Sequence, residues 1–235
     1  MKSGISIFDV DRTLTRKPTY SAFLIYGALR TSPWRLLLIP LLIPYAIAYA
    51  LNRISRKQMK EAMHMVALGN RLKRERATRL AESFAHSLVE DGVFREAFEA
   101  MDAERRNGRR IVLATAAPEL YIAPFARLVG ADAVLASRAS WDSDRLTPQI
   151  AGENCYGVHK FDMIREWLEL QNIQRENADI RFFSDHVSDL PTFEWVDEPI
   201  MVNPSPKLRA IGQERGWSKL DWKTSEGRGM PDQIG

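Results

Sequence analysis

Apolar residues first form a short run and then recur at helical spacing. Residues 4–10 are typical of a short buried strand, and residues 5–8 of this run lead directly into Asp9, the first of two carboxylates. From residue 12 to about residue 90, apolar side chains instead recur every three or four positions, as in Met59, Met63 and Val66. We therefore predict a first strand followed by an inserted helical unit.

Beyond Gly92, helical and strand patterns alternate. The amphipathic segment 93–107 predicts a helix that Gly108 ends, and the apolar run 110–115 predicts the next strand. This alternation is typical of an α/β fold with a parallel sheet. The other predicted strands are 133–135, 180–183 and 200–202, and the other predicted helices are 118–128, 158–170 and 206–215.

One uncharged and mostly apolar run, residues 36–51, stands apart from this pattern. A membrane-spanning helix needs roughly 20 apolar residues, and Pro40 and Pro44 both interrupt backbone hydrogen bonding, so a simple span is not expected. Two interpretations stay open: a core-facing helical hairpin, or a segment that dips into a lipid interface. The aromatic and basic neighbours that suit the second are Trp34, Tyr45, Tyr49, Arg35 and Arg53.

Charge is divided unevenly along the chain. Residues 12–79 contain fourteen Lys and Arg residues but only Glu61 and Glu75, a net charge of +12. Because the whole chain carries +3, the remainder carries −9. The basic segment is expected to face an anionic partner, which composition leaves open among a phosphate substrate, a lipid surface and nucleic acid.

Composition bounds the class and the compartment. With 235 residues, of which 45% are hydrophobic, the chain can bury a sizeable core and is not expected to be disordered or fibrous. The single cysteine, Cys155, cannot form an internal disulfide, and Asp9 lies where a secretory signal would be apolar. A reducing, cytoplasmic location is expected.

The two carboxylates after the first strand are the first candidate site. Asp9 and Asp11 lie on the same side of an extended segment, at the strand end where ligands bind in open parallel sheets. Such close carboxylates repel unless a cation lies between them, and Mg²⁺ prefers oxygen ligands. Taken alone, the pair is equally compatible with a turn whose Asp side chains bond backbone amides.

Polar residues also follow the later strands. Thr115 and the small Ala116 end the second strand, where backbone amides can approach a phosphate. Lys160 lies near the start of a predicted helix, and Asp185 and Asp189 follow the strand at 180–183. Their occurrence in this order makes separate structural roles less plausible than one shared site.

With these motifs assembled, the chain resembles the haloacid dehalogenase superfamily, in its phosphoserine-phosphatase-like branch. The resemblance is ordered and covers most of the chain. It rests on Phe-Asp-Val-Asp-Arg-Thr-Leu-Thr at 8–15, Leu-Ala-Thr-Ala-Ala at 113–117, Lys160, Ser-Asp-His-Val-Ser-Asp-Leu-Pro at 184–191, and Val-Asn-Pro-Ser-Pro-Lys-Leu-Arg-Ala at 202–210 with Gly216-Trp217.

This resemblance implies a Rossmann-like α/β core with a central parallel sheet and a helical cap inserted after the first strand. The implied catalytic core comprises residues 1–15 and 92–217, and the cap comprises residues 16–91. Residues 218–235 are expected to form a flexible tail. In this branch the cap closes over the active site and selects the substrate.

The resemblance also implies catalytic roles. Asp9 would attack phosphorus and become an aspartyl phosphate, while Asp11 would act as general acid and then base, with Thr13 ordering the loop. Carbon–halogen cleavage in this superfamily does without an acid at the position of Asp11, so phosphate ester hydrolysis is favoured. Thr115, the Ala116 amide and Lys160 would hold the transferring oxygens.

A magnesium site is implied as well. Asp9, the Asp11 carbonyl and Asp185 would bind Mg²⁺, and Asp189 would steady Lys160 or metal-bound water. Two positions depart from the pattern. His186 stands where the family has a small hydroxyl residue and would alter the surroundings of the metal. Ala116-Ala117 stands where phosphoserine phosphatases have glycines, which argues against phosphoserine itself.

The leading prediction is a Mg²⁺-dependent phosphatase acting on a phosphorylated small molecule or on an amphiphilic or lipid phosphate, with peripheral contact at the anionic inner face of a membrane. The first alternative is a soluble phosphatase of small metabolites. The non-enzymatic alternative is a membrane- or nucleic-acid-binding module that has lost catalysis. Nucleic acid is not expected, because the basic segment is interleaved with aliphatic residues rather than with stacking aromatics.

Overall fold

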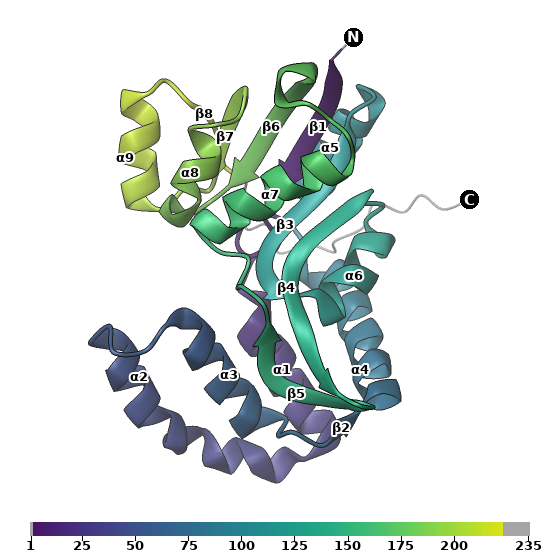
Figure 1. Cartoon of the computed structure of the whole chain (residues 1–235), viewed down its shortest axis with the longest axis vertical. Coiled ribbons are helices and arrows are strands. Elements are labelled where there is room, and N and C mark those ends of the chain that lie inside the picture. Colours follow the sequence, from purple (N-terminus) through teal and green to yellow (C-terminus); the bar gives the residue numbers. More distant parts are fainter. Residues whose placement is uncertain (1, 223–235) are drawn as a thin grey trace.

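The computed structural model describes residues 2–222 and contains one mixed sheet with helices on both faces (Figure 1). The strands lie in the order β2-β5-β4-β3-β1-β6-β7-β8. Neighbours from β4 to β8 are parallel, whereas β5 is antiparallel to both β4 and β2. The predicted α/β fold with a central parallel sheet is therefore confirmed. The strands are β1 Ser3–Phe8, β2 Leu72–Lys73, β3 Arg110–Pro118, β4 Ala133–Asp142, β5 Arg145–Ala151, β6 Ala178–Ser184, β7 Glu198–Val202 and β8 Ser218–Leu220.

Alternation along the central strands explains the layers. Ile111 and Leu113 of β3 face one apolar cluster, and Val112 and Ala114 face the other, because successive side chains of a strand point to opposite faces. Burial on both faces is what a parallel sheet requires. The covering helices of the core are α5 Arg95–Arg106, α6 Glu119–Leu128, α7 Val158–Leu170, α8 Leu190–Phe193 and α9 Pro206–Glu214.

A helical unit, which we call the cap, occupies the chain between β1 and β3. Its helix α3 begins with a capping box, in which Ser55 and Gln58 each bond the other's backbone. Phe23 and Phe84 of the cap pack on Tyr121 of the core at ring-centroid distances of 4.6 and 5.2 Å. The cap elements are α1 Thr19–Thr31, η1 Pro33–Leu42, α2 Ile43–Ala50, α3 Arg56–Ala67, α4 Arg74–Ser87 and η2 Leu88–Gly92.

The strand predicted at 133–135 is longer than expected and forms a hairpin. β4 continues to Asp142, turns at Ser143 in a left-handed conformation, and returns as β5, which the sequence interpretation missed. The outer half of β4 is only half-buried and mixes polar with apolar residues, so it lacks a continuous apolar run. β5 pairs with β2, so the segment expected to be purely helical also contributes a short strand to the sheet.

The prediction of a tail from residue 218 is partly wrong. Ser218–Leu220 form β8, which adds a parallel edge strand to β7. Trp217 stacks on Phe193 with ring centroids 5.2 Å apart, and Trp222 contacts Phe94 at 6.0 Å. These aromatic contacts lie beside the edge strand. The prediction of a tail rested instead on the Gly-rich sequence further along the chain. The rest of that prediction, residues 223–235, lies outside the described residues.

The apolar run forms an exposed helical arm, residues 33–51, built from η1 and α2 (Figure 1). No residue of either helix is buried, which rules out the core-facing hairpin. Within residues 2–222, Pro33–Ala50 alone has the length and apolarity of a membrane-spanning helix, with a mean hydropathy of 1.4 over 18 residues. Both ends of the arm return to the cap, since η1 packs on α1 and α3 and α2 packs on α3.

A buried histidine in the cap links folding to pH. His64 of α3 is 8% exposed, and its Nε2 atom has no hydrogen-bond partner. Burial, and secondarily the nearby charge of Arg35, lower the pKa of His64 from 6.5 to about 4. The folded protein therefore holds this imidazole neutral at a pH where the unfolded chain protonates it.

This difference predicts a loss of stability in acid. Stability from neutral His64 is complete above pH 6.5 and declines as the pH falls toward 4, by about 3 kcal/mol in total. Urea unfolding of wild type and His64→Gln across this range should give a shallower pH dependence for the variant. The exposed His86, changed to Gln, is the matched control. Equal pH dependences in wild type and His64→Gln would contradict the assignment.

Candidate active site

The first motif forms a tight loop after β1. The Asp9 amide bonds the Phe183 carbonyl of β6 at 2.9 Å, and the amides of Leu14 and Thr15 each bond the Val10 carbonyl at 3.0 Å. Arg12 turns the loop in the left-handed region, with φ of 64°, which is strained for a residue with a side chain. The loop therefore places Asp9 at the carboxyl end of the sheet.

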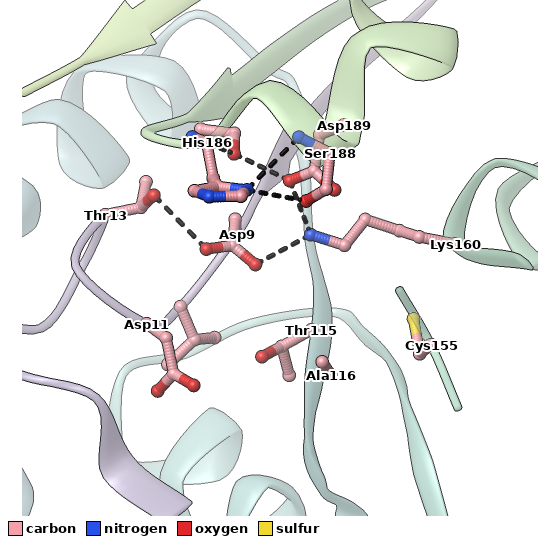
Figure 2. A network of polar contacts seen from close by, with 12 residues as sticks. Asp9, Asp11, Thr13, Thr115, Ala116, Cys155, Lys160, His186, Ser188 and Asp189 are labelled. Atoms are coloured by element: carbon pink, nitrogen blue, oxygen red, sulfur yellow. Dashed lines mark hydrogen bonds and ion pairs between the residues drawn. The ribbon is translucent and has the colours of Figure 1, made fainter. Parts of the chain in front are cut away.

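A buried ion-pair network holds the Asp9 carboxylate (Figure 2). Lys160 Nζ lies 2.7 Å from Asp9 Oδ1 and 2.7 Å from Asp189 Oδ2. Thr13 donates to the other Asp9 oxygen at 3.3 Å, and Ser184 donates to Asp189 at 2.7 Å. Side chains from β1, α7 and the segment after β6 are thereby fixed against one another.

Burial raises the pKa of two carboxylates of this site, those of Asp9 and Asp185. Desolvation raises the pKa of Asp9 to about 6, with Lys160 opposing the shift and Asp189 adding to it. Desolvation also raises the pKa of Asp185 to about 8, and repulsion from Asp9 and Asp189 adds to it. Burial alone would lower the pKa of Lys160, but the two adjacent carboxylates outweigh it and raise that pKa.

The surplus of carboxylates fits a hard cation. Among residues 2–222, no group of three or more His, Cys, Asp or Glu side chains forms a ready metal cage. However, Asp9, Asp11 and Asp185 line one pocket, and Asp185 is buried without any hydrogen bond or ion pair to its carboxylate. An unpartnered buried carboxylate is costly as an anion. Two carboxylates and a backbone carbonyl are oxygen ligands of the kind that Mg²⁺ takes together with water.

The second motif contributes the floor of the pocket. Thr115 and Ala116 line it at the end of β3, where pairing with β4 becomes irregular. The Thr115 hydroxyl accepts from the Ala117 amide at 3.1 Å. The Ala116 carbonyl accepts from Lys60 Nζ of the cap at 2.5 Å and from the Ser137 hydroxyl at 2.9 Å. A cap lysine thus holds the backbone of this loop.

Asp11 is oriented by residues that the sequence interpretation missed. Its Oδ1 accepts from the Thr19 amide at 2.8 Å and the Thr19 hydroxyl at 2.7 Å, at the first turn of α1. The Thr19 hydroxyl also lies 2.9 Å from the Tyr121 hydroxyl. Thr19 following Pro18 at a helix start was the available signal. The Asp11 carboxylate accordingly turns from Asp9 toward the cap (Figure 2).

His186 stabilises the turn that follows β6. Its Nδ1 accepts from the Ser188 amide at 3.1 Å and lies 2.9 Å from the Ser188 hydroxyl. Burial is the main cause that lowers the pKa of His186. A neutral ring with Nδ1 as acceptor is therefore the form that stabilises this turn.

The predicted residues converge on one pocket of about 270 Å³. All of them line it except Thr13, which lies behind Asp9 and bonds it. The sequence interpretation missed the mouth, where Arg56 of α3 lies over the Tyr156 ring at 4.3 Å and Arg12 joins them. In the sequence, Arg56 was visible only as a member of the basic segment, and Arg12 was part of the first motif but had no role assigned to it. The predicted residues that line the pocket are Asp9, Asp11, Thr115, Ala116, Lys160, Asp185, His186 and Asp189.

Known proteins are similar to this chain in sequence. A probable phosphatase of Mycobacterium tuberculosis is 33% identical over 137 residues, which are 58% of this chain and 47% of that protein. The chain thus spans about half the length of that relative. The protein CicA of Caulobacter vibrioides is 33% identical over 162 residues, which are 68% of this chain and 70% of that one.

Solved structures extend the likeness to the fold. A protein of unknown function from Bordetella pertussis superposes with a TM-score of 0.83 at 24% identity, covering 94% of this chain and 99% of that one. A probable phosphoserine phosphatase from Vibrio cholerae gives 0.68 at 14% identity, covering 94% and 61%. Residues 7–194 match the sequence pattern of haloacid dehalogenase-like hydrolases. With its acidic loop, lysine and second acidic segment in this order, the chain belongs to the haloacid dehalogenase-like hydrolase family.

Proposed function

We propose that this hydrolase cleaves phosphate monoesters through a phosphorylated Asp9. The observation that carries the proposal is the orientation of the Asp9 carboxylate, whose two oxygens are held by Lys160 and Thr13 at the base of the pocket. A carboxylate fixed in this way can attack phosphorus in line. The P–O bond to the leaving group breaks as the bond to Asp9 forms.

Asp11 would transfer the protons. Because Thr19 occupies its Oδ1, the other carboxylate oxygen is free to protonate the leaving oxygen. The carboxylate formed then accepts a proton from the water that attacks phosphorus. The products are inorganic phosphate and an alcohol, and Asp9 is restored. Lys160, Thr115 and the Ala116 amide would hold the phosphoryl oxygens throughout.

Asp9, Asp185 and the Asp11 carbonyl would hold Mg²⁺ in this proposal. When bound, the ion supplies positive charge to the phosphoryl oxygens. Without the ion, the Asp185 carboxylate is buried with no partner, and burial raises its pKa to about 8. Asp189 would keep Lys160 charged and in place through their 2.7 Å contact.

The mouth of the pocket favours an anionic substrate. Its carboxylates are Asp9, Asp11, Asp185 and Asp189, all of which belong to the proposed catalytic set. No further acidic residue among the residues lining this pocket is left to bind the ammonium of an amino acid, whereas Arg12 and Arg56 present positive charge. A soluble small-metabolite phosphatase, resembling the phosphoserine phosphatases that share the fold, is the second candidate.

The arm supports an amphiphilic substrate such as a lipid phosphate, and peripheral contact of the protein with the cytoplasmic face of an anionic membrane. Large apolar side chains, among them Leu37 at 81% and Leu41 at 60% exposure, are turned outward along it. Contiguous exposed apolar surface of this kind marks an interaction site. Arg35 and Arg53 near its ends carry the charge that anionic headgroups attract. Nucleic acid remains outside the proposal.

Replacing the nucleophile tests the reaction. Asp9→Asn keeps the size of the side chain but removes the attacking oxygen, so turnover of a generic aryl phosphate with Mg²⁺ should fall by at least about 10⁴-fold. Asp162→Asn, an exposed change on α7, is the matched control. Wild-type turnover in folded Asp9→Asn would exclude an aspartyl-phosphate mechanism.

Asp11→Asn tests the proton transfers separately. Both formation and breakdown of the phosphoenzyme should slow by roughly 10² to 10⁴-fold, because one carboxylate serves both steps. Rapid-quench labelling resolves the two rates. If neither rate changed, another group in the pocket would have to carry the protons, and His186 would be examined next.

Changes on the arm test the membrane contact. The double variant Leu37→Ser and Leu41→Ser should bind anionic vesicles about a hundredfold more weakly, about tenfold for each exposed leucine removed. The matched control is Val158→Ser with Leu170→Ser. These two exposed apolar residues belong to α7, a helix that lies outside the cap. Turnover of a soluble phosphate should survive in both. If vesicle binding were unchanged in the arm variant and only the wild type formed dimers, the arm would instead be assigned to contact with a second copy of the chain.

A further inference from the structure

A basic pocket of about 380 Å³ lies at the foot of the arm, apart from the catalytic pocket. Arg35, Arg71 and Arg76 line it, together with the polar Thr31, Ser32 and Asn70. No Asp or Glu belongs to its lining, and it shares no residue with the catalytic pocket. The pocket therefore concentrates positive charge that the proposed reaction does not use.

Arg35 is held in a fixed position there. Its Nε donates to the Val66 carbonyl at 3.0 Å and its Nη2 to the Met65 carbonyl at 2.5 Å, at the last turn of α3. Gly69, with φ of +72°, leaves room for this guanidinium, because a Cβ atom there would lie 3.0 Å from Arg35 Nη2. A preorganised guanidinium loses little conformational freedom when it binds an anion.

The other two arginines are also available. Arg76 Nη2 donates to the Arg30 carbonyl at 3.0 Å, which positions the group without neutralising it. Arg71 has an exposed side chain with no hydrogen bond or ion pair among the described residues. Of the acidic residues of α3 and α4, Glu75 pairs with Arg79, Glu61 accepts from the Ile150 amide, and Glu82 lines a different pocket. The positive charge of the pocket is thus uncompensated.

We propose that this pocket binds the phosphate of an anionic lipid headgroup. The proposal rests on the membrane contact proposed for the arm. Thr31 and Ser32 of the pocket lead directly into η1, and Arg35 lies 5.4 Å from the ring of Trp34 on the exposed arm. An anion site contiguous with an exposed apolar helix matches a lipid, whose phosphate and acyl chains are joined. A free phosphate offers the same anion but nothing for the arm to contact.

The test compares two double variants of equal charge change. Arg71→Gln with Arg76→Gln alters the pocket, and Lys207→Gln with Arg209→Gln removes two exposed cations of α9, outside the pocket and away from the arm. Binding to vesicles of phosphatidylcholine with phosphatidic acid is measured at physiological salt and near 1 M salt. At the higher salt the Debye length is about 3 Å, so diffuse attraction is screened and contact pairs dominate.

At high salt, the pocket variant should bind about thirty-fold more weakly than wild type, as expected for two arginines in contact with headgroups, while the control variant matches wild type. Equal losses in the two variants would overturn the pocket and leave only diffuse charge. Suppose that inorganic phosphate binds the wild-type pocket and that vesicle binding is unchanged in the pocket variant. That result would overturn the lipid assignment. Arg71→Gln alone breaks no contact and repeats the test if the double variant fails to fold.

Turnover of a soluble aryl phosphate is measured in parallel. It should be the same in wild type and in both double variants, because none of the four residues lines the catalytic pocket. A wild-type protein that binds vesicles through this pocket but hydrolyses no phosphate would remove the proposed reaction and keep the lipid site. An active enzyme whose two variants bind vesicles equally would remove the lipid site and keep the proposed reaction.

Discussion

The active site depends on the pairing of one buried lysine with two carboxylates. Asp9, Asp185 and Asp189 come together at the carboxyl edge of the sheet, where Lys160 is the buried cation between Asp9 and Asp189. Removing either partner of such a pair would leave an uncompensated buried charge. Asp185 stays outside the pairing, and burial raises its pKa to about 8, so a divalent cation suits the site.

Tertiary packing brings the cap to this cluster. The chain leaves β1, forms the Asp9 loop and enters α1, so Thr19 at the helix start reaches Asp11 eight residues before it. α3 then places Arg56 at the mouth and Lys60 against the Ala116 carbonyl. The cap therefore contributes both to the lining of the pocket and to the geometry of the loop that ends β3.

Much of this arrangement was predictable because it follows from strand ends. Asp9, Thr115 and Asp185 each come directly after an apolar run, and parallel strands bring their carboxyl ends together. Arg56 and Thr19 were not predictable in the same way, since their places depend on how the cap packs. The β4–β5 hairpin was missed because its outer half alternates between polar and apolar residues near the sheet edge. The arm could not be assigned because hydropathy is the same for a buried and an exposed run.

The hairpin also limits how the pocket can open. In an enzyme whose cap is joined to its core by two flexible linkers, the cap can rotate about those linkers as a rigid body. Here β5 runs from the core sheet and pairs with β2 of the cap, while α3 packs on β5. This third connection is a hydrogen-bonded ribbon, so moving the cap means bending a strand. β4 of the same ribbon carries Ser137, whose hydroxyl donates to the Ala116 carbonyl, so the cap and the loop that lines the pocket are joined through one hydrogen-bonded sheet.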